Sequence, residues 1–392
     1  MTTTSVANHH PNKQPASGLA AIILAAGCSS RMGQFKPLLS IGGCTAVETV
    51  VRLFLSAGIP DVCVVIGHNA DELRPVAEAA GARCVLNPNF EQGMFSSVRA
   101  GVAALREGTD ACFVIPVDIP LVRSSTVRRL AGFYAAEKSA IVYPVFQGRR
   151  GHPPLISSAI LAEALTMGTD ARLSALLASH EEKACDLFVP DEAIHLDMDT
   201  PDEVARIREL AEHREIPSLL ECEAILAQNQ VDERVVRHSR MVADVAYRIA
   251  SALAKRNLPI EPSLVRAGGL LHDLAKGVPD HATAGAQLLR DLEFESVAGV
   301  VAVHTDYSFT EQRLDEAAIV YLADKLVSGE SVVGLAQRFR RSEERFRENP
   351  IALAAASRRR DAAEAIARKI ESLLGAELHL VINGLSVGDH LA

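Results

Sequence analysis

The sequence predicts a two-part protein, in which an α/β unit with a mostly parallel sheet and helices on both faces is followed by an all-α unit. Short apolar runs alternate with amphipathic stretches over residues 19–212, as strands and helices do in a parallel sheet. Over residues 213–375 the strand-like alternation is missing, and Ala, Leu, Arg and Glu dominate a helical pattern. Residues 1–18 are polar and predict a disordered leader, and residues 376–392 form a tail without a usable motif.

The composition narrows the class of protein. A chain of 392 residues with 48% hydrophobic residues has material for two or three domains. The net charge of −9 and the lack of a large basic block argue against nucleic acid as a partner. No apolar run approaches the ~20 residues that a membrane span needs, so no membrane partner is expected. Seven cysteines are scattered singly, which favours reduced thiols and a cytoplasmic location.

The α/β unit can be divided into elements by its apolar spacing. Strands are predicted at 20–24, 62–67, 83–86, 111–116, 140–145 and 185–189. Helices are predicted at 46–57, 70–80, 96–106 and 124–136. In such sheets ligands gather at the carboxyl ends of the strands, so the segments that follow the strands are the candidate sites.

A glycine-rich loop follows the first predicted strand. Gly27 and Gly33 allow tight turns, so that successive backbone N–H groups can converge on an anion. Arg31 and Lys36 add positive charge beside them, and Ser29 adds a hydroxyl group. The spacing is neither that of a dinucleotide-binding loop nor that of a Walker loop. The loop therefore predicts a different kind of phosphate site.

Other polar segments follow later strands. Ser96, after the third strand, would cap a helix whose open N-terminus could bind an anion. Asp118 ends an apolar strand, where a carboxylate can hold a hard cation or simply form a turn. Arg150 and His152 suit an anionic phosphate or form a solvated basic turn. Near residue 200, Asp199 or Thr200 could cap a last helix.

These segments together resemble the MobA-like nucleotidyltransferases that handle molybdopterin, whose loop has the form LAAGxSxRMGxxK. The resemblance implies a Rossmann-like nucleotidyltransferase domain with Mg²⁺ bound by Asp118 and Asp199. It implies catalytic roles for Arg31, Lys36 and Asp118. It implies acceptor binding by Arg150 and His152. The nucleotide-binding residues that it implies are Leu24, Ala25, Ala26, Gly27, Ser29, Arg31, Lys36, Asn87, Gly93 and Ser97.

The implied reaction is nucleotidyl transfer, in which a phosphate oxygen of molybdopterin attacks the α-phosphorus of a nucleoside triphosphate and pyrophosphate leaves. In the family an Ala-Ala-Gly loop goes with cytidine, so Ala25-Ala26-Gly27 favours CTP. The implied partners are CTP, molybdopterin or the molybdenum cofactor, and an apo molybdenum hydroxylase that receives the product. Open alternatives are GTP as donor, another phosphorylated acceptor, and a cofactor-binding chaperone with a regulatory second unit.

The all-α unit carries histidines and aspartates on apolar helix faces. These residues are His238, His272, Asp273, His281, His304 and Asp324. Any one of them alone would be better explained as a hydrogen-bonded core residue. A shared metal would satisfy all of them together. Nitrogen mixed with carboxylate oxygen suits Fe, Mn, Zn or Ni better than Ca.

The ordered set resembles the HD-domain metal-dependent phosphohydrolases, and within them the branch with six ligands and two metals that includes symmetrical diadenosine tetraphosphate hydrolases. The resemblance implies that His238, His272, Asp273 and Asp324 hold one metal. Asp273 would bridge to a second metal, held also by His281 and His304. The family expects Gly after the first of these histidines, where this chain has Ala282. Lys276 would meet a substrate phosphate or complement a helix C-terminus.

Overall fold

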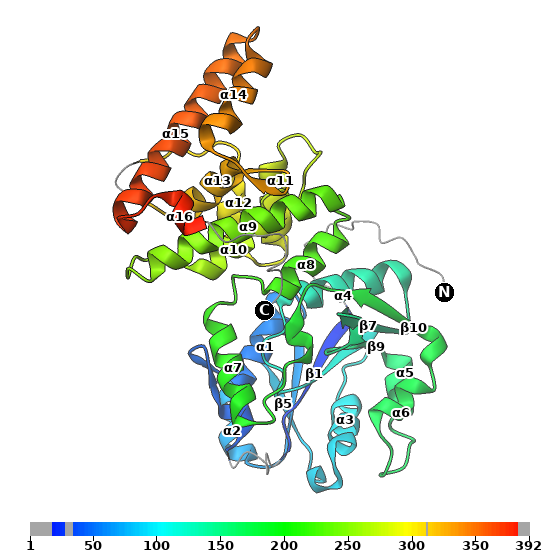
Figure 1. Ribbon diagram of the computed structural model, residues 1–392. Helices are drawn as coiled ribbons and strands as arrows, with labels where there is room; N and C mark the ends of the chain where they lie inside the picture. Colours follow the sequence, from blue (N-terminus) through cyan, green and yellow to red (C-terminus); the bar gives the residue numbers. More distant parts are fainter. Residues whose placement is uncertain (1–17, 28–33, 311–312, 383–392) are drawn as a thin grey trace. The chain divides into compact units, whose positions relative to one another are not determined.

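The computed structural model describes residues 18–27, 34–310 and 313–382 (Figure 1). The chain divides into two compact units, Met1–His213 and Arg214–Ala392. Nearly all of the predicted leader, the end of the predicted tail, and the predicted nucleotide-binding residues Ser29 and Arg31 lie outside the described residues. Within the described part of the chain, no helix is long and apolar enough to span a membrane.

The first unit is built on one mixed sheet, which has eight strands among the described residues. Their order is β10-β7-β9-β6-β1-β4-β5, with β8 paired to β7. The strands are β1 (Leu19–Leu24), β4 (Asp61–Ile66), β5 (Arg83–Leu86), β6 (Ala111–Pro116), β7 (Ile141–Phe146), β8 (Arg149–Arg150), β9 (Leu155–Ser157) and β10 (Ala184–Phe188). Each of the six predicted strands is present to within one residue at either end. The additional β8 and β9 run antiparallel to their neighbours.

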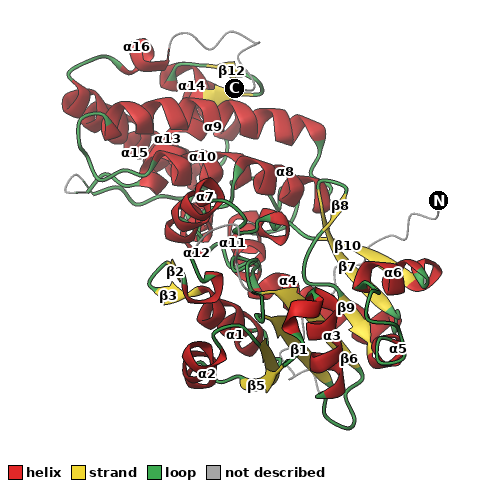
Figure 2. Ribbon diagram, turned by 90° about the horizontal axis from the view of Figure 1, so that it is seen from below, coloured by secondary structure: helices red, strands yellow, loops and turns green. Residues whose placement is uncertain are grey.

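Helices cover both faces of this sheet (Figure 2). They are α1 (Ala46–Ser56), α2 (Ala70–Ala79), α3 (Met94–Ala103), α4 (Ser124–Glu137), α5 (Ser158–Glu163), α6 (Leu173–Ala178) and α7 (Pro201–Glu212). Helices α3, α5 and α6 pack on the face that carries Ile22. On the opposite face Phe54 of α1 contacts Phe113, with ring centroids 5.5 Å apart. The predicted mostly parallel sheet with helices on both faces is thus confirmed.

The helix starts show how local sequence positions the site loops. Thr200 caps α7 with a capping box to Glu203, and Pro201 occupies the first turn. The helix near residue 96 begins earlier than predicted, at Met94, and Ser96 is not its cap. Gly93 occupies the cap position at a φ of 94°, which disfavours other residues there. A hairpin of β2 (Ser40–Ile41) and β3 (Cys44–Thr45) was not predicted.

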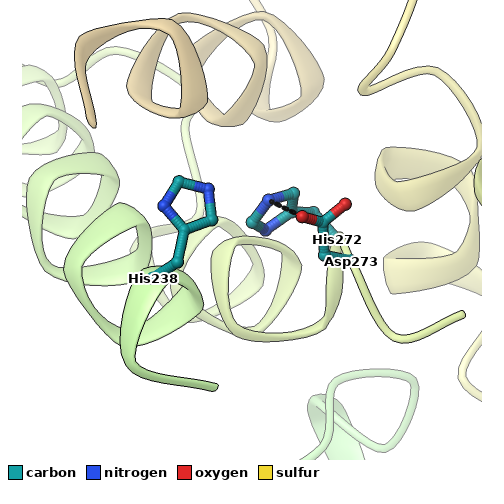
Figure 3. A group of neighbouring side chains, drawn as sticks. All are labelled: His238, His272 and Asp273. Carbon is teal, nitrogen blue, oxygen red and sulfur yellow. Dashed lines mark ion pairs between the residues drawn. The ribbon is translucent and has the colours of Figure 1, made fainter. Parts of the chain in front are cut away.

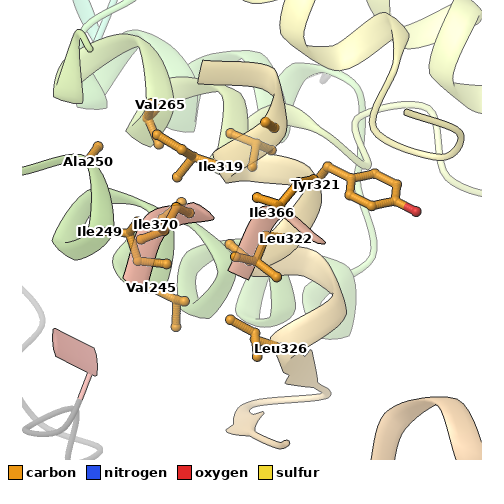
Figure 4. Close-up of a cluster of buried hydrophobic side chains, with 14 of the residues drawn as sticks. Val245, Ile249, Ala250, Val265, Ile319, Tyr321, Leu322, Leu326, Ile366 and Ile370 are labelled. Carbon is orange, nitrogen blue, oxygen red and sulfur yellow. The ribbon is translucent and has the colours of Figure 1, made fainter. Parts of the chain in front are cut away.

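The second unit is helical, as predicted, apart from a short hairpin of β11 (Val327–Ser328) and β12 (Ser331–Val332). Its helices are α8 (Leu219–Gln228), α9 (Glu233–Ala254), α10 (Pro262–Leu271), α11 (His281–Asp291), α12 (Glu295–Ala302), α13 (Glu316–Leu326), α14 (Leu335–Phe346), α15 (Pro350–Leu374) and α16 (Leu378–Ile382). The main core lies between α9, α10, α13 and α15 and includes Ile249, Val265, Leu322 and Ile366 (Figure 4).

Two glycines let α10 lie close to its neighbours. A Cβ at Gly269 would lie 2.6 Å from the Cα of Ala243 in α9. A Cβ at Gly268 would lie 2.7 Å from a methyl group of Val300 in α12. Both distances are shorter than carbon atoms tolerate, so glycine is what allows these contacts. His272 directly follows α10, so this close packing fixes where its backbone lies.

Candidate functional site

In the first unit, the carboxyl ends of β1, β4, β5 and β6 lie along one edge of the sheet because these strands are parallel. The residues at or just after these ends are Leu24–Gly27, Gly67–His68, Asn87 and Asp118. Three of these four positions were predicted as site segments, and His68 was not. Its backbone N–H donates to the carbonyl of Ala26, which joins two of the loops.

Lys36 joins two carboxylates that are far apart in the sequence. Its Nζ lies 2.6 Å from Oδ1 of Asp199 and 3.4 Å from Oδ2 of Asp118. The lysine side chain is only 12% exposed. Burial lowers the pKa of Lys36, but the hydrogen bond that it donates to Asp199 and the charges of both aspartates outweigh this effect, so the pKa lies above its usual value. Lys36 is therefore a fixed cation, in contact with both predicted magnesium ligands.

A backbone contact brings the two aspartates together. The N–H of Met198 donates to the carbonyl of Asp118 at 3.1 Å, and the Met198 side chain is fully buried. Asp197 lies on the other side of this methionine. Burial raises the pKa of Asp197, and the charges of Asp199, Glu203 and Asp118 raise it further. The site therefore has an excess of carboxylate oxygens, which are the donors that Mg²⁺ prefers.

The predicted phosphate loop is only partly described. Leu24, Ala25 and Ala26 are buried, and the N–H of Ala25 donates to the carbonyl of Val65. Because this N–H already bonds within the sheet, it is not one of the loop amides that could bind an anion. Gly27 is exposed. The rest of the loop, with the predicted Ser29 and Arg31, lies outside the described residues.

Asn87 holds the predicted nucleotide segment in shape. It is 2% exposed, and its Nδ2 donates to the hydroxyls of Ser96 at 2.8 Å and Ser97 at 3.0 Å. Its Oδ1 accepts from the N–H of Asn89. The amide group thus joins its own segment, through Asn89, to the first turn of α3, through Ser96 and Ser97. This geometry favours a positioning role for Asn87.

Arg150 and His152, the two residues predicted to bind the acceptor, differ in their hydrogen-bond partners. The Arg150 guanidinium donates to both carboxylate oxygens of Glu181, at 2.7 and 2.9 Å, and to Asp186 at 2.6 Å. It also lies 4.2 Å from the ring centroid of Tyr143. Arg150 is therefore engaged by two carboxylates and an aromatic face, and its partners Glu181 and Asp186 lie 31 and 36 residues away in the sequence. That Arg150 binds an anionic acceptor stays a prediction.

His152 fits an acceptor site better. Its Nδ1 is buried and has no hydrogen-bond partner among the described residues. Burial lowers the pKa of His152, and the nearby charge of Asp118 only partly opposes this shift. At neutral pH the ring is therefore uncharged, and its Nδ1 bonds to none of the described residues.

In the second unit, six predicted residues converge from five segments, and Figure 3 shows how His238, His272 and Asp273 lie. His238 comes from α9, and His272 and Asp273 follow α10. His281 begins α11, His304 follows α12, and Asp324 lies in α13. Ligand atoms of His238, His272 and Asp273 lie within 4.8 Å of one another, as do those of Asp273, His281 and His304. The two groups share Asp273.

Carboxylate oxygens face histidine Nε2 atoms throughout this centre. Oδ1 of Asp324 lies 3.2 Å from His238 and 3.7 Å from His272. Oδ2 of Asp273 lies 3.5 Å from His272. Oδ1 of Asp273 lies 3.2 Å from His281 and 3.5 Å from His304. The two oxygens of Asp273 thus face different groups of histidines, as a bridging ligand requires.

Backbone carbonyls determine which nitrogen of three histidines points inward. Nδ1 of His238 lies 3.0 Å from the carbonyl of Gly329. Nδ1 of His272 lies 2.8 Å from the carbonyl of Gly269, and Nδ1 of His304 lies 2.7 Å from that of Val301. A carbonyl only accepts, so each Nδ1 carries a proton, and in the neutral ring each Nε2 has a lone pair. This orientation is typical of histidines that bind metals.

The donor set fits transition-metal ions. His272 is fully buried, and its Nε2 has no hydrogen-bond partner among the described residues. Such an atom is costly unless something binds it. Burial raises the pKa of Asp273, but the neighbouring His272 and His304 and the charge of Lys276 outweigh it and hold that pKa well below its usual range. The carboxylate is therefore ionised, and nitrogen and oxygen donors converge on the same two positions.

Comparison with known proteins agrees with both centres. Residues 21–184 match the MobA-like NTP transferase domain, and residues 235–329 match the HD domain. A molybdenum cofactor cytidylyltransferase from Escherichia coli (strain K12) is 30% identical over 196 residues, which cover 49% of this chain and 97% of the relative. The chain belongs to the MobA-like NTP transferase family. It is therefore an enzyme of the nucleotidyltransferase class that carries an HD domain.

Other similar proteins cover the same half of this MobA-like NTP transferase. A nicotine blue oxidoreductase from Paenarthrobacter nicotinovorans is 31% identical over 196 residues, which cover 48% of this chain and 96% of that protein. A solved structure of a nucleotidyl transferase from Methanothermobacter thermautotroptrophicus has 24% identity and a TM-score of 0.45, and covers 50% of this chain and 99% of that one.

In this MobA-like NTP transferase the structure also reveals a residue that sequence reasoning missed. Asp191 is 1% exposed and accepts hydrogen bonds from Arg123 N at 2.9 Å, Thr126 Oγ1 at 2.7 Å and Ala193 N at 3.2 Å. It thereby fixes the start of α4, directly after the turn that contains Asp118. Its sequence signal is weak, because an aspartate before a short turn is typical of any surface loop.

Proposed function

We propose that the N-terminal unit transfers CMP from CTP to molybdopterin or the molybdenum cofactor and releases pyrophosphate. The observation that carries the proposal is the contact of Lys36 with both Asp118 and Asp199 at the carboxyl edge of the sheet. The choice of substrates is supported by the similarity to a protein named molybdenum cofactor cytidylyltransferase. It is also supported by the Ala25-Ala26-Gly27 loop, which resembles that of cytidine-transferring relatives.

Each residue of this site has a task that its surroundings suit. Asp118 and Asp199 would hold Mg²⁺, which supplies charge neutralisation for the triphosphate when bound. Lys36 places a fixed positive charge beside them, where negative charge on the leaving pyrophosphate grows. His152 offers an uncharged polar ring for the acceptor. No covalent enzyme intermediate is needed, because in-line attack by a positioned phosphate oxygen suffices.

For the C-terminal unit we propose metal-dependent hydrolysis of a phosphate ester or nucleotide. His238, His272 and Asp324 would hold one divalent ion and His281 and His304 a second, with Asp273 between them. The mixed nitrogen and oxygen donors favour Fe, Mn, Zn or Ni. Such a pair of ions supplies an activated water and a clamp for a phosphate group.

The full-length protein tests the transferase proposal. It is incubated with Mg²⁺, molybdenum cofactor and either CTP or GTP, and pyrophosphate release and the dinucleotide product are measured. We expect release with CTP and loss of about 10²–10³ in rate for Asp118→Asn, because an essential charged group is removed. The matched control is Asp170→Asn, an exposed aspartate of the same unit. Release with GTP alone, or only with another phosphorylated acceptor, would replace the substrate assignment.

A separate outcome addresses the chaperone alternative. If the protein binds molybdenum cofactor and an apo molybdenum hydroxylase but Asp118→Asn still supports cofactor delivery in cells, the unit acts by binding and not by transfer. For the HD domain, phosphate release from a panel of nucleotides and phosphate esters is measured with Mn²⁺ or Fe²⁺ present. No release from any of them, while His272→Gln and the wild type behave alike, would remove the hydrolase proposal.

A further inference from the structure

The six residues that converge in the second unit (His238, His272, Asp273, His281, His304 and Asp324) are called the HD centre below. Two lysines contact its two carboxylates in different ways. Nζ of Lys276 lies 3.1 Å from Oδ1 and 3.0 Å from Oδ2 of Asp273. Nζ of Lys325 lies 2.6 Å from Oδ2 of Asp324 only. Lys276 therefore interacts with both oxygens of its aspartate, whereas Lys325 interacts with one oxygen and leaves Oδ1 to face the histidines.

The ammonium group of Lys325 is largely buried and has several partners. Its side chain is 12% exposed, its Nζ lies 3.5 Å from the carbonyl of His304, and the ring centroid of Tyr321 is 4.7 Å away. The carboxylate, the carbonyl and the aromatic face together surround the ammonium group. The oxygen that it contacts is not the one that faces His238 and His272. Metal binding at Oδ1 of Asp324 would leave this ion pair in place.

Lys276, in contrast, has an exposed side chain and contacts the oxygens that face the histidines. Its side chain is 49% exposed, although the carboxylate that it contacts is 5% exposed. Both oxygens of that carboxylate also face histidine Nε2 atoms, at 3.2 to 3.5 Å. The lysine thus competes for the same oxygen atoms that a cation among these nitrogens would use. Its long and exposed side chain can move away without unfolding anything.

We propose that Lys276 is a displaceable counter-cation of the HD centre: it neutralises Asp273 when the centre is metal-free, leaves that carboxylate when metal binds, and then pairs with the phosphate group of the ligand. This inference rests on the metal-binding part of the proposed function. It adds that metal loading and anion binding are coupled through one side chain.

The charge balance of the centre supports the second half of this proposal. Without metal, the two lysines match the two aspartates, and the histidines can be neutral. Two divalent ions would leave a surplus of four positive charges on these side chains and ions. An anion with two or more charges, such as a terminal phosphate or pyrophosphate group, offsets such a surplus better than a singly charged diester. The favoured ligand class is therefore a multiply charged phosphate.

The test uses the full-length protein with Asp118→Asn in every variant, so that the carboxylates of the first unit contribute equally throughout. Mn²⁺ is titrated into the metal-free protein by calorimetry, and inorganic phosphate is then titrated into the loaded protein. We expect Lys276→Met to bind Mn²⁺ about tenfold more tightly and phosphate about tenfold more weakly, since one charge leaves the centre. Lys255→Met, an exposed lysine at the far end of α9, is the matched control and should change neither.

Because Mn²⁺ affinity should rise while phosphate affinity falls, the expected result can be told apart from misfolding and from a structural role of Lys276. Misfolding would weaken both affinities, and a purely structural Lys276 would change neither or lower only the melting temperature. If Lys276→Met binds Mn²⁺ no more tightly than the control, the counter-cation role is wrong. If the unmodified centre binds no Mn²⁺ at all, the proposed metal function fails first, and that failure is visible before any lysine is changed.

Discussion

The Nε2 atoms of His281 and His304 lie 3.2 Å apart, and both face Oδ1 of Asp273. Because Nδ1 of His304 donates to Val301, the Nε2 of that histidine has a lone pair. A neutral His281 can donate its Nε2–H to this lone pair across the 3.2 Å contact, and a metal ion that displaces this proton can bind both nitrogens. Burial lowers the pKa of His281, and the charge of His304 lowers it further, so the ring is neutral and suited to be a metal ligand.

Changing His281 should therefore empty only one of the two positions. His281 belongs to one group of ligands, whereas His238 and Asp324 belong to the other. In the Asp118→Asn background, which removes a carboxylate of the proposed magnesium site, we expect His281→Gln to lower the Mn²⁺ content of the desalted protein from two ions per chain to one. The measurement is elemental analysis against protein concentration. Retention of two ions, or loss of both, would contradict the division into two groups.

Metal should also stabilise the second unit against heat. An ion that binds the folded centre and not the unfolded chain at 100 times its Kd adds about 2.7 kcal/mol of stability. Calorimetry of the full-length protein should show the transition of this unit rising on addition of Mn²⁺ and falling again with a chelator. In Asp324→Asn the shift should be at least halved. An equal shift in wild type and variant would place the stabilising ion elsewhere.

Lys36 should matter for turnover more than for folding. Its ammonium group faces Asp118 and Asp199 beside the proposed triphosphate. We expect Lys36→Met to lower kcat about 10²-fold, since a charge that stabilises the transition state is lost. Lys36→Arg, which keeps the charge with a different shape, should recover part of it. Pyrophosphate release under saturating CTP measures the effect, and an unchanged kcat with a raised KM would show that Lys36 only binds the substrate.

Asp191 should contribute mainly to stability. Its buried carboxylate accepts from two backbone N–H groups and the hydroxyl of Thr126. Asp191→Ala leaves these donors unsatisfied and should cost about 3 kcal/mol of unfolding free energy. Urea unfolding measures this cost, with Asp170→Ala as the exposed control. A loss below about 0.5 kcal/mol, the range of ordinary surface changes, would show that water replaces the carboxylate.

The pH dependence of stability should report on His152. Its pKa in the folded protein lies below the ordinary value of 6.5, because burial disfavours the charged ring. The unfolded chain therefore binds more protons, and stability is lost as the pH falls below about 6.5. In His152→Gln this part of the loss should disappear. Unfolding free energies between pH 7 and pH 5 measure it, and parallel profiles for the two proteins would refute the shift.

The sequence was sufficient to predict the boundaries of those strands whose residues form one continuous apolar run. The apolar runs at 111–116 and 83–86 coincide with β6 and β5 residue for residue. By contrast, β8 consists of Arg149 and Arg150 alone, and two charged residues carry no strand pattern. Helix α3 begins earlier than predicted, because Gly93 can cap a helix through backbone conformation without a side-chain oxygen.

For the sites, the order of histidines and aspartates in the second half predicted which residues converge. It did not predict that both oxygens of Asp273 contact Lys276, because that contact depends on where the chain turns after α10. Nor could it predict that Glu181 and Asp186 engage Arg150, since strand order decides which distant residues become neighbours. Periodicity and motif order are local information, whereas such partners are set by tertiary structure.

The close contact of Gly269 with Ala243 has a consequence for ion selectivity. This contact between two backbones limits how far α10 can lie from α9, and with it how far the backbone of His272 lies from that of His238. We therefore expect the nitrogens of these two histidines to keep a nearly constant separation when a cation binds. Ions whose radius matches that separation should bind best. Larger ions should bind more weakly, because they fit only if the packed helices α9 and α10 move apart.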